Sequence, residues 1–255
     1  MPLISIITVT YNASATIKRT AQSVVSQSYK DFEWLVVDGA SSDDTLSLVR
    51  TSGCECLTVV SERDRGLYDA MNKGIRFAKG VYLIFLNAGD SFYCEDSLKL
   101  ITEAIGKDPS ADVVYGQTIL VDATGRYIAD RHLRAPESLS FKDFAQGMVV
   151  CHQAFVVRRS IAPMFDLSYR YSADYKWCIE VLKRSTNNIY VNATIIAYLY
   201  EGLSTVNRRK SLIERFKIMA CYYGFFPTLW RHLGFVGRFM KHNRAVKKAV
   251  RDDKN

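Results

Sequence analysis

The feature that most constrains the fold is the stretch of residues 81–91, in which six apolar residues (VYLIFL) are followed at once by Asn87, Ala88, Gly89 and Asp90. A continuous apolar run of this length, with β-branched and aromatic members, predicts a strand buried on both faces of a sheet. Open α/β sheets bind ligands beyond the carboxyl ends of their strands, where Asn87 and Asp90 would lie. An ordinary turn would show the same polar pattern, so the rest of the chain has to decide between the two.

Three earlier runs have the same character. Residues 3–10 (LISIITVT), 32–37 (FEWLVV) and 57–60 (LTVV) are apolar, and a segment with helical periodicity follows each of them. We therefore predict right-handed βα units that build a doubly wound, mostly parallel α/β sheet. Polar residues follow the three strands: Tyr11, Asn12, Asp38 and Asp64. The carboxyl edge of the sheet thus collects side chains that can bind a ligand.

Short polar residues next to these strands predict helix starts. Ser14 is expected to cap the first helix, and Ser41 or Ser42 the second. Beyond Ser91 the pattern changes, because residues 112–129 predict a hairpin and residues 189–200 a final strand. We therefore expect a mixed extension of the sheet.

Two polar positions in the second half of the chain have competing interpretations. His152 and Gln153 interrupt the apolar run 147–157, and a histidine in such a run is usually a hydrogen-bonded core residue. Asp174 follows Ser172 at the start of a predicted helix, where a carboxylate is usually only a cap. The residues themselves leave both interpretations open.

Composition excludes several classes of function. The chain has no Gly-x-Gly-x-x-Gly and no Gly-x-x-x-x-Gly-Lys-Ser/Thr, so a nucleotide would have to be held by side chains and a metal ion. The six cysteines form no paired Cys-x-x-Cys clusters, which favours reduced thiols over a zinc site or a disulfide scaffold. No apolar run reaches the roughly 18 residues of a membrane span, and no signal peptide precedes the first strand. These observations predict a cytosolic protein.

The basic charge is confined to the end of the chain. Residues 205–255 hold 13 Lys and Arg against 3 Asp and Glu, whereas residues 1–204 are slightly acidic. Apolar residues recur there at helical spacing: Leu212, Phe216, Met219, Tyr223, Leu229, Leu233, Val236 and Met240, with Arg231, Arg238 and Lys241 roughly opposite the second set. This layout favours a helix at an anionic membrane surface, and docking on the protein itself or on a partner stays open. A nucleic-acid-binding module is the alternative, although the acidic remainder offers no continuous basic groove.

Four segments, taken together, resemble the successive motifs of the family 2 glycosyltransferases. They are residues 5–12 (SIITVTYN), 36–45 (VVDGASSDDT), 64–74 (DRGLYDAMNKG) and 86–90 (LNAGD), in the order of the family. The likeness covers roughly residues 1 to 200 and is greatest to bacterial members that build exopolysaccharide, capsule or O-antigen repeat units.

The resemblance implies a GT-A fold and inverting transfer of a hexosyl or N-acetylhexosaminyl group from a nucleotide-diphosphate sugar to a saccharide or polyprenyl-linked acceptor. We expect a transferase domain over residues 1–204, with a nucleotide-sugar half (1–90) and an acceptor half (91–204). Residues 205–255 would form a basic, aromatic helical tail that attaches the enzyme to the inner face of the membrane.

The same resemblance implies roles for individual residues. Tyr11 would stack on the nucleotide base, Asp38 would accept a hydrogen bond from its edge, and Asp64 would lie near the base and the ribose. Asp90 would hold a divalent cation, Mn²⁺ or Mg²⁺, and Asp174 would be the general base. The further expected contacts are Thr8, Asn12, Gly66, Asp69, Asn72, Asn87 and Ala88 to the nucleotide sugar, and His152 and Gln153 on the acceptor side.

One position departs from the family pattern. The family often has Asp where this chain has Asn87, so one carboxylate fewer would hold the cation, which Mg²⁺ and Mn²⁺ tolerate with phosphate and water as further ligands. A transferase that binds sugar nucleotides without turnover is therefore an alternative. A sugar nucleotidyltransferase has less support, because residues 10–13 (TYNA) are not a Gly-rich basic loop.

Overall fold

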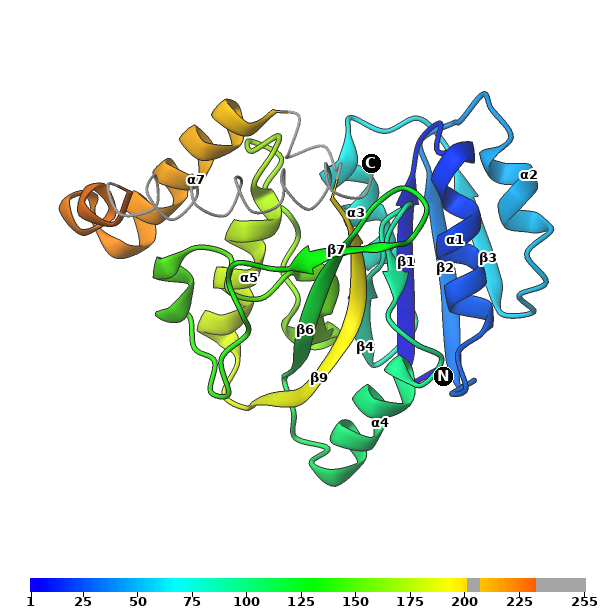
Figure 1. Ribbon diagram of the computed structural model, residues 1–255, viewed down its shortest axis with the longest axis horizontal. Coiled ribbons are helices and arrows are strands. Elements are labelled where there is room, and N and C mark those ends of the chain that lie inside the picture. Colours follow the sequence, from blue (N-terminus) through cyan, green and yellow to red (C-terminus); the bar gives the residue numbers. More distant parts are fainter. Residues whose placement is uncertain (201–206, 233–255) are drawn as a thin grey trace, which may run out of the picture.

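The computed structural model describes residues 1–200 and 207–232 (Figure 1). Within these residues one mixed sheet of nine strands crosses the molecule in the order β3-β2-β1-β4-β8-β6-β9-β5, with β7 paired to β6. Five residues of the expected tail pattern lie outside the described residues: Leu233, Val236, Arg238, Met240 and Lys241.

The first part of the chain, up to β4, is the predicted run of βα units. Its elements are β1 (Ile4–Thr10), α1 (Ser14–Val25), β2 (Phe32–Asp38), α2 (Thr45–Arg50), β3 (Leu57–Ser61), α3 (Leu67–Phe77) and β4 (Tyr82–Phe85). All four strands are parallel, and Thr10 lies opposite Asp38, which lies opposite Ser61. The carboxyl ends of β1, β2 and β3 therefore meet at one edge of the sheet, as predicted.

The part of the chain after β4 extends the sheet with mixed pairing. Its elements are β5 (Ser91–Phe92), α4 (Ser97–Lys107), β6 (Val113–Val121), β7 (Tyr127–Asp130), η1 (Asp143–Gln146), η2 (His152–Ala154), β8 (Phe155–Arg158), η3 (Arg159–Ile161), α5 (Ala173–Arg184) and β9 (Asn188–Leu199). Strand β8 runs antiparallel to β4 and β6, whereas β6 and β9 are parallel. The predicted hairpin is confirmed as β6 and β7, with Gly125 N–H donating to Asp122 O at 3.0 Å.

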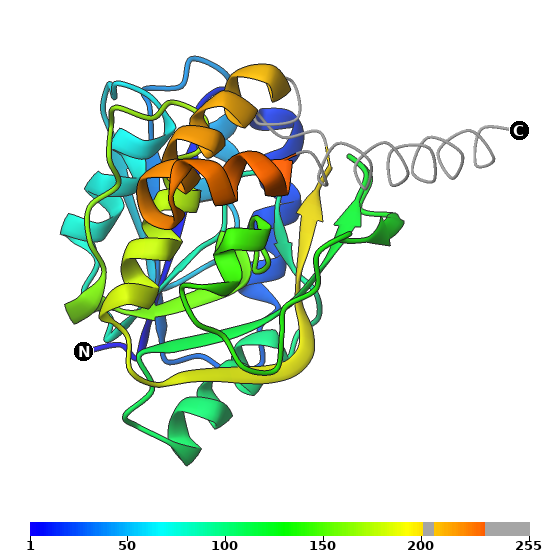
Figure 2. The same cartoon turned by 90° about the vertical axis from the view of Figure 1, so that its left-hand side faces the viewer.

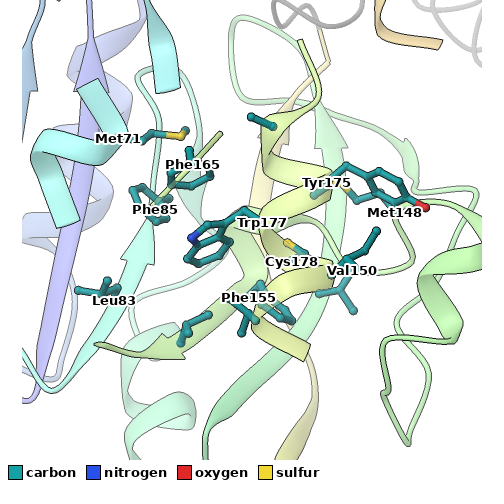
Figure 3. Packing of buried hydrophobic residues seen from close by; sticks show 14 of the residues in the cluster. Met71, Leu83, Phe85, Met148, Val150, Phe155, Phe165, Tyr175, Trp177 and Cys178 are labelled. Carbon is teal, nitrogen blue, oxygen red and sulfur yellow. The ribbon is translucent and has the colours of Figure 1, made fainter. Parts of the chain in front are cut away.

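Each face of the sheet has its own hydrophobic core, because the strands are buried on both sides. One core lies under α3 and α5, and the other under α1 and α4 with Val49 of α2. In the first core Phe85 of β4 meets the rings of Phe165 and Trp177, with centroids 5.2 and 5.6 Å away (Figure 3). The apolar runs in the sequence thus become strands shared by two cores.

The expected helix caps are wrong. Helix α1 starts at Ser14 without a side-chain cap, and α2 starts after Asp44, also without one. The first amides of α1 are satisfied instead by the loop after β2: Asp43 Oδ2 accepts from Ser14 N–H at 3.0 Å, and Thr45 Oγ1 from Ala13 N–H at 2.8 Å. The start of α1 is therefore capped by residues about 30 positions away in the sequence. The sequence next to α1 does not reveal this contact.

The final described helix, α7 (Arg208–Tyr223), packs on the protein. Ile218 and Met219 belong to the core under α3 and α5, whereas Leu212 is 48% exposed. The buried side therefore differs at Leu212 from the expected stripe. No helix of the described part of the chain is long and apolar enough to cross a membrane.

Candidate active site

At the edge formed by β1, β2 and β3, Tyr11 and Asp64 come together around Gly39. A Cβ atom on residue 39 would lie 2.6 Å from Asp64 Oδ2 and 3.2 Å from Tyr11 Cδ2. Tyr11 is 65% exposed, so its ring is free to stack on a ligand. Two residues expected at the base of a nucleotide therefore border one spot.

The loop after β2 is held by Asp38. Its buried carboxylate accepts bonds from the backbone N–H and hydroxyl of Ser41, and from Ser61 Oγ at 2.7 Å. The loop also bonds to Asn12, whose Oδ1 accepts from Ser42 N–H at 2.9 Å. Asp38 fixes the wall beside Tyr11, and its contact to a base edge stays a prediction.

The turn before α3 orients Asp64. Gly66 has φ = +120°, a conformation that favours glycine, and its N–H donates to Asp64 Oδ1 at 2.8 Å. Asp69 accepts from Arg65 N–H at 3.0 Å and from its guanidinium at 3.3 Å. The Arg65 N–H bond is the main reason that the pKa of Asp69 lies below its usual value. The bonds of Gly66 and Asp69 therefore fix the turn that carries Asp64.

Two expected contacts are bonded inside the protein. Thr8 Oγ1 accepts from Trp34 Nε1 at 2.9 Å, and the Asn72 amide bonds both the N–H and the O of Phe165, at 2.7 and 2.9 Å. Both side chains are buried. Their direct contact to a ligand stays a prediction.

The loop after β4 places Asp90 in the interior. Asp90 is only 4% exposed; Oδ2 accepts from Gln153 Nε2 at 2.8 Å, and Oδ1 from Leu199 N–H at 3.0 Å. Burial raises the pKa of Asp90 to about 6, although these hydrogen bonds oppose the shift. The carboxylate is therefore fixed by β9 and η2, two elements distant in the sequence.

Helix α1 supports this loop with residues that sequence reasoning missed. Arg19 donates to the carbonyls of Gly89 and, at 2.8 Å, Asp122. Thr20 Oγ1 donates to Asp90 O at 2.7 Å and accepts from Gly89 N–H at 2.9 Å. Gly89 has φ = +99°, and a Cβ there would lie 2.8 Å from Leu199 Cδ2, so this position requires glycine.

Asp174 lies in the first turn of α5, with its side chain 13% exposed and no side-chain cap bond at the helix start. Oδ2 is 3.2 Å from His152 Nδ1, and Oδ1 accepts from Tyr68 Oη at 2.9 Å. Burial alone would raise the pKa of Asp174, but His152, the charge of Arg215 and the Tyr68 hydroxyl together lower it. The carboxylate is thus kept ionised and oriented.

A single 3-10 turn connects the two carboxylates. Successive residues of η2 bond to them: His152 to Asp174, and Gln153 to Asp90. His152 Nε2 also lies 3.4 Å from Asn87 Nδ2. Residues from three separate segments of the sequence are thereby brought into one network. Ala88, beside Asn87, is half-buried and donates its N–H to Val9 O at 3.3 Å.

The donor atoms at this loop fit a hard cation. Asn87 Oδ1 is buried and accepts no hydrogen bond within the described structure, and a carbonyl oxygen is a ligand that Mg²⁺ and Mn²⁺ accept. Asp90 adds a carboxylate. No group of three or more His, Cys, Asp or Glu that could hold a metal occurs in residues 1–200 and 207–232, so phosphate and water would complete the shell.

Comparison with known proteins gives consistent matches. The family model "Glycosyl transferase family 2" matches residues 5–163. A "PGL/p-HBAD biosynthesis glycosyltransferase" of Mycobacterium bovis is 33% identical over 223 residues, covering 84% of both chains. A "Putative teichuronic acid biosynthesis glycosyltransferase TuaG" of Bacillus subtilis is 28% identical over 202 residues, covering 77% of this chain and 79% of its own.

Solved structures show the same fold. The mannosyltransferase PcManGT of Pyrobaculum calidifontis, in complex with GDP-Man and Mn²⁺, matches with a TM-score of 0.67 at 17% identity. The match covers 98% of this chain and 74% of the other.

Proposed function

Since this chain belongs to glycosyl transferase family 2, we propose that it moves a sugar from a nucleotide-diphosphate sugar to a saccharide or polyprenyl-linked acceptor in cell-surface polysaccharide synthesis. It is an inverting glycosyltransferase with a GT-A fold. The observation that carries the proposal is the network in which η2 bonds both Asp174 and Asp90. The relatives named for PGL/p-HBAD and teichuronic acid biosynthesis support the class of product.

Asp174 is the general base in this proposal. Inversion by a single displacement needs one group that takes the proton from the acceptor hydroxyl. Tyr68 and His152 each bond one oxygen of Asp174, and a carboxylate has further lone pairs that can accept the acceptor O–H. Because the pKa of Asp174 is lowered, the base is ionised throughout the neutral range.

The donor lies along the carboxyl edge of the parallel strands. Tyr11 stacks on the base, and Asp64 accepts a hydrogen bond from the base or the ribose, with Gly39 between them as the floor. The lack of a side chain at Gly39 lets the ligand approach the backbone. A hexosyl or N-acetylhexosaminyl donor fits this proposal, and GDP-Man in the similar mannosyltransferase belongs to that chemical class.

A divalent cation, Mn²⁺ or Mg²⁺, would be held by Asp90 and Asn87 Oδ1. When bound, the cation neutralises the negative charge of the departing diphosphate. The protein's own contribution is to hold Asp90 through Gln153 and Leu199, and to keep Asn87 Oδ1 without an internal partner. The Mn²⁺ in the mannosyltransferase structure supports a cation at this kind of site.

The described end of the chain fits attachment to the inner face of the membrane. Residues 225–232 are helical and follow Gly224. They expose four large apolar side chains: Phe225, Phe226, Leu229 and Trp230, at 54, 79, 44 and 79%. Exposed basic residues lie on the same part of the chain: Arg209, Lys210, Lys217 and Arg231. Apolar anchors with nearby positive charge favour anionic lipid.

The membrane proposal is tested with the intact chain, because removing residues 205–255 would also remove core residues Ile218 and Met219. The wild type should bind vesicles that contain anionic lipid, and it should not bind vesicles of phosphatidylcholine alone. Trp230→Ser should weaken this binding without changing the melting temperature, since Trp230 is 79% exposed. Equal binding of Trp230→Ser and the wild type would contradict the proposal.

The transferase is tested by thermal shift and turnover against UDP, GDP, CDP and dTDP sugars with Mn²⁺, Mg²⁺ or EDTA. A ligand that binds only the native state raises the apparent melting temperature. One nucleotide class should do so only with metal, and Asp90→Ala should lose the response. The same donor should be turned over by the wild type and not by Asp174→Asn. Binding without turnover would instead favour the non-catalytic alternative that Asn87 motivates.

A further inference from the structure

Helix α7 and the segment that carries Asp174 both lie beyond residue 163, where the family match ends, and α7 is bonded to that segment. It lies over α5 on the side of the molecule that faces the viewer in Figure 2. Tyr222 Oη of α7 donates to Glu180 Oε1 of α5 at 2.7 Å. The two helices are therefore joined at the C-terminal end of α7 as well as at the contacts that follow.

Glu214 binds the backbone just before α5. Its Oε1 accepts from Arg170 N–H at 3.0 Å, and its Oε2 accepts from Tyr171 N–H at 2.8 Å. One carboxylate thus satisfies two successive amides, through charge-assisted hydrogen bonds that are stronger than neutral ones. These amides precede Ser172, the N-cap residue of α5.

Ser211, one turn earlier in α7, holds the next residue. Ser172 Oγ lies 3.0 Å from Ser211 Oγ and 3.2 Å from Ser211 O, and both serines are buried. Three consecutive residues, 170–172, are thereby fixed by two residues of α7. Asp174 follows two positions later, so the position of its backbone depends on the bonds that Ser211 and Glu214 make to residues 170–172.

Arg215 brings positive charge to the same point. Its guanidinium lies over the Tyr175 ring, 5.9 Å from the centroid, and its charge attracts Asp174. The Arg215 Nε atom is buried and has no hydrogen-bond partner in the described structure. The side chain therefore acts on Asp174 through charge and not through a hydrogen bond from Nε.

We propose that α7 completes the active site: Ser211 and Glu214 are positioning residues that fix the start of α5, and Arg215 supplies the positive charge beside Asp174. This inference rests on the proposed role of Asp174 as the base. It gives a catalytic role to a helix of the basic tail, for which the sequence favoured a membrane surface and left docking on the protein or on a partner open.

The first test replaces Glu214 with Gln. The amide can accept from only one of the two N–H groups and turns its own NH₂ toward the other. We expect kcat to fall by about tenfold to a hundredfold, because displacing a catalytic group by about 1 Å has this effect. Donor KM and the donor-induced thermal shift should stay unchanged, since Tyr11 and Asp64 are on other elements. Ile213→Ala, at an exposed position of the same helix that has no assigned role, is the control and should keep full activity.

The second test is the pH profile of Arg215→Gln. The groups that face Asp174 are His152 of η2, Tyr68 of α3, Arg215 of α7, and the thiols of Cys151 and Cys178. Loss of the Arg215 charge should raise the pKa of Asp174 and move the acid limb of kcat to higher pH. Arg215→Lys should restore the wild-type limb, and Ile213→Ala should match the wild type. A purely structural role would not give this difference between Gln and Lys.

The outcomes distinguish a failure of the role of α7 from a failure of the proposed function. Nucleoside diphosphate release is measured with the donor that stabilises the wild type. A wild type that binds no donor and releases none overturns the proposed function. A wild type that turns over while Glu214→Gln and Arg215→Gln keep its kcat and pH profile overturns the role of α7 and leaves the proposed function standing. If Glu214→Gln does not fold, the contrast between Arg215→Gln and Arg215→Lys decides.

Discussion

On the proposed nucleotide side of the site, Tyr11 exposes 65% of its surface and meets Asp64 around a glycine. On the proposed acceptor side, the Asp174 side chain is 13% exposed and both of its oxygens already have partners within the protein. The exposed ring of Tyr11 can make further contacts to a ligand, whereas the contacts that orient Asp174 already exist within the folded protein.

Because of this difference, we expect substitutions on the two sides to change different kinetic constants. An exposed ring contributes to binding only when the ligand is present, so its loss should change KM and leave the stability of the free protein intact. A buried, hydrogen-bonded carboxylate is preorganised for chemistry, so its loss should change kcat. The comparison fails if substitutions on the two sides change the same kinetic constant.

The largest effect is expected for Asp174→Asn. The amide has nearly the same shape but cannot take a proton, so kcat should fall by about 10² to 10⁴, the usual contribution of a general base. The donor-induced thermal shift should be retained. Steady-state kinetics with the identified donor measure both. A loss below about threefold would mean that the base lies elsewhere.

The next largest effect is expected for Tyr11→Ala. Stacking of a base on an aromatic ring contributes about 1 to 3 kcal/mol, so donor KM should rise by about fivefold to 150-fold with little change in kcat. Because the ring is exposed, the melting temperature without ligand should not move. Tyr11→Phe keeps the ring and is the matched control. An equal loss in Tyr11→Phe would show that the hydroxyl, and not stacking, is used.

The sequence was sufficient to predict that the residues of the proposed nucleotide side meet at one edge of the sheet, because they directly follow strands. Tyr11, Asp38 and Asp64 each come at or shortly after the end of an apolar run, and a parallel sheet brings such ends together without further information. The fold of this half was predicted for the same reason. Its helix caps were not, because Asp43 and Thr45 reach the start of α1 from another βα unit.

The acceptor side could be predicted only in part, because its bonds join residues far apart in the chain. Tyr68 and Asp174 are 106 positions apart, and Leu199 and Asp90 are 109 apart. The resemblance indicated Asp174, His152 and Gln153 singly, but not that one turn bonds both carboxylates. Helical periodicity marks apolar positions, so it gave no signal for Ser211 or Glu214 in α7.

Tyr68→Phe tests whether the hydroxyl on Asp174 matters beyond packing. Removing one hydrogen bond to a charged group of this kind costs about 1.5 kcal/mol, so we expect kcat to fall by about tenfold. The lost bond also stabilised the ionised form, so the pKa of Asp174 should rise and the acid limb of kcat should move to higher pH. A profile with the wild-type limb would restrict Tyr68 to a packing role.

The smallest effect is expected in the pH dependence of stability, which distinguishes Asp90 from Asp174. Burial raises the pKa of Asp90 to about 6, whereas the pKa of Asp174 is lowered. Between the unfolded value of 3.8 and the folded value, the folded protein binds the Asp90 proton more tightly, so this group adds stability as the pH falls. From pH 8 to pH 5 the gain is about 1.4 kcal/mol, or about 3 to 5 °C in melting temperature. In EDTA and without donor, the wild type should show this gain relative to Asp90→Asn, because other titrating groups are common to both proteins. A difference between the two that is constant from pH 8 to pH 5 would mean that Asp90 is already ionised at pH 5, and that its buried site does not oppose its charge.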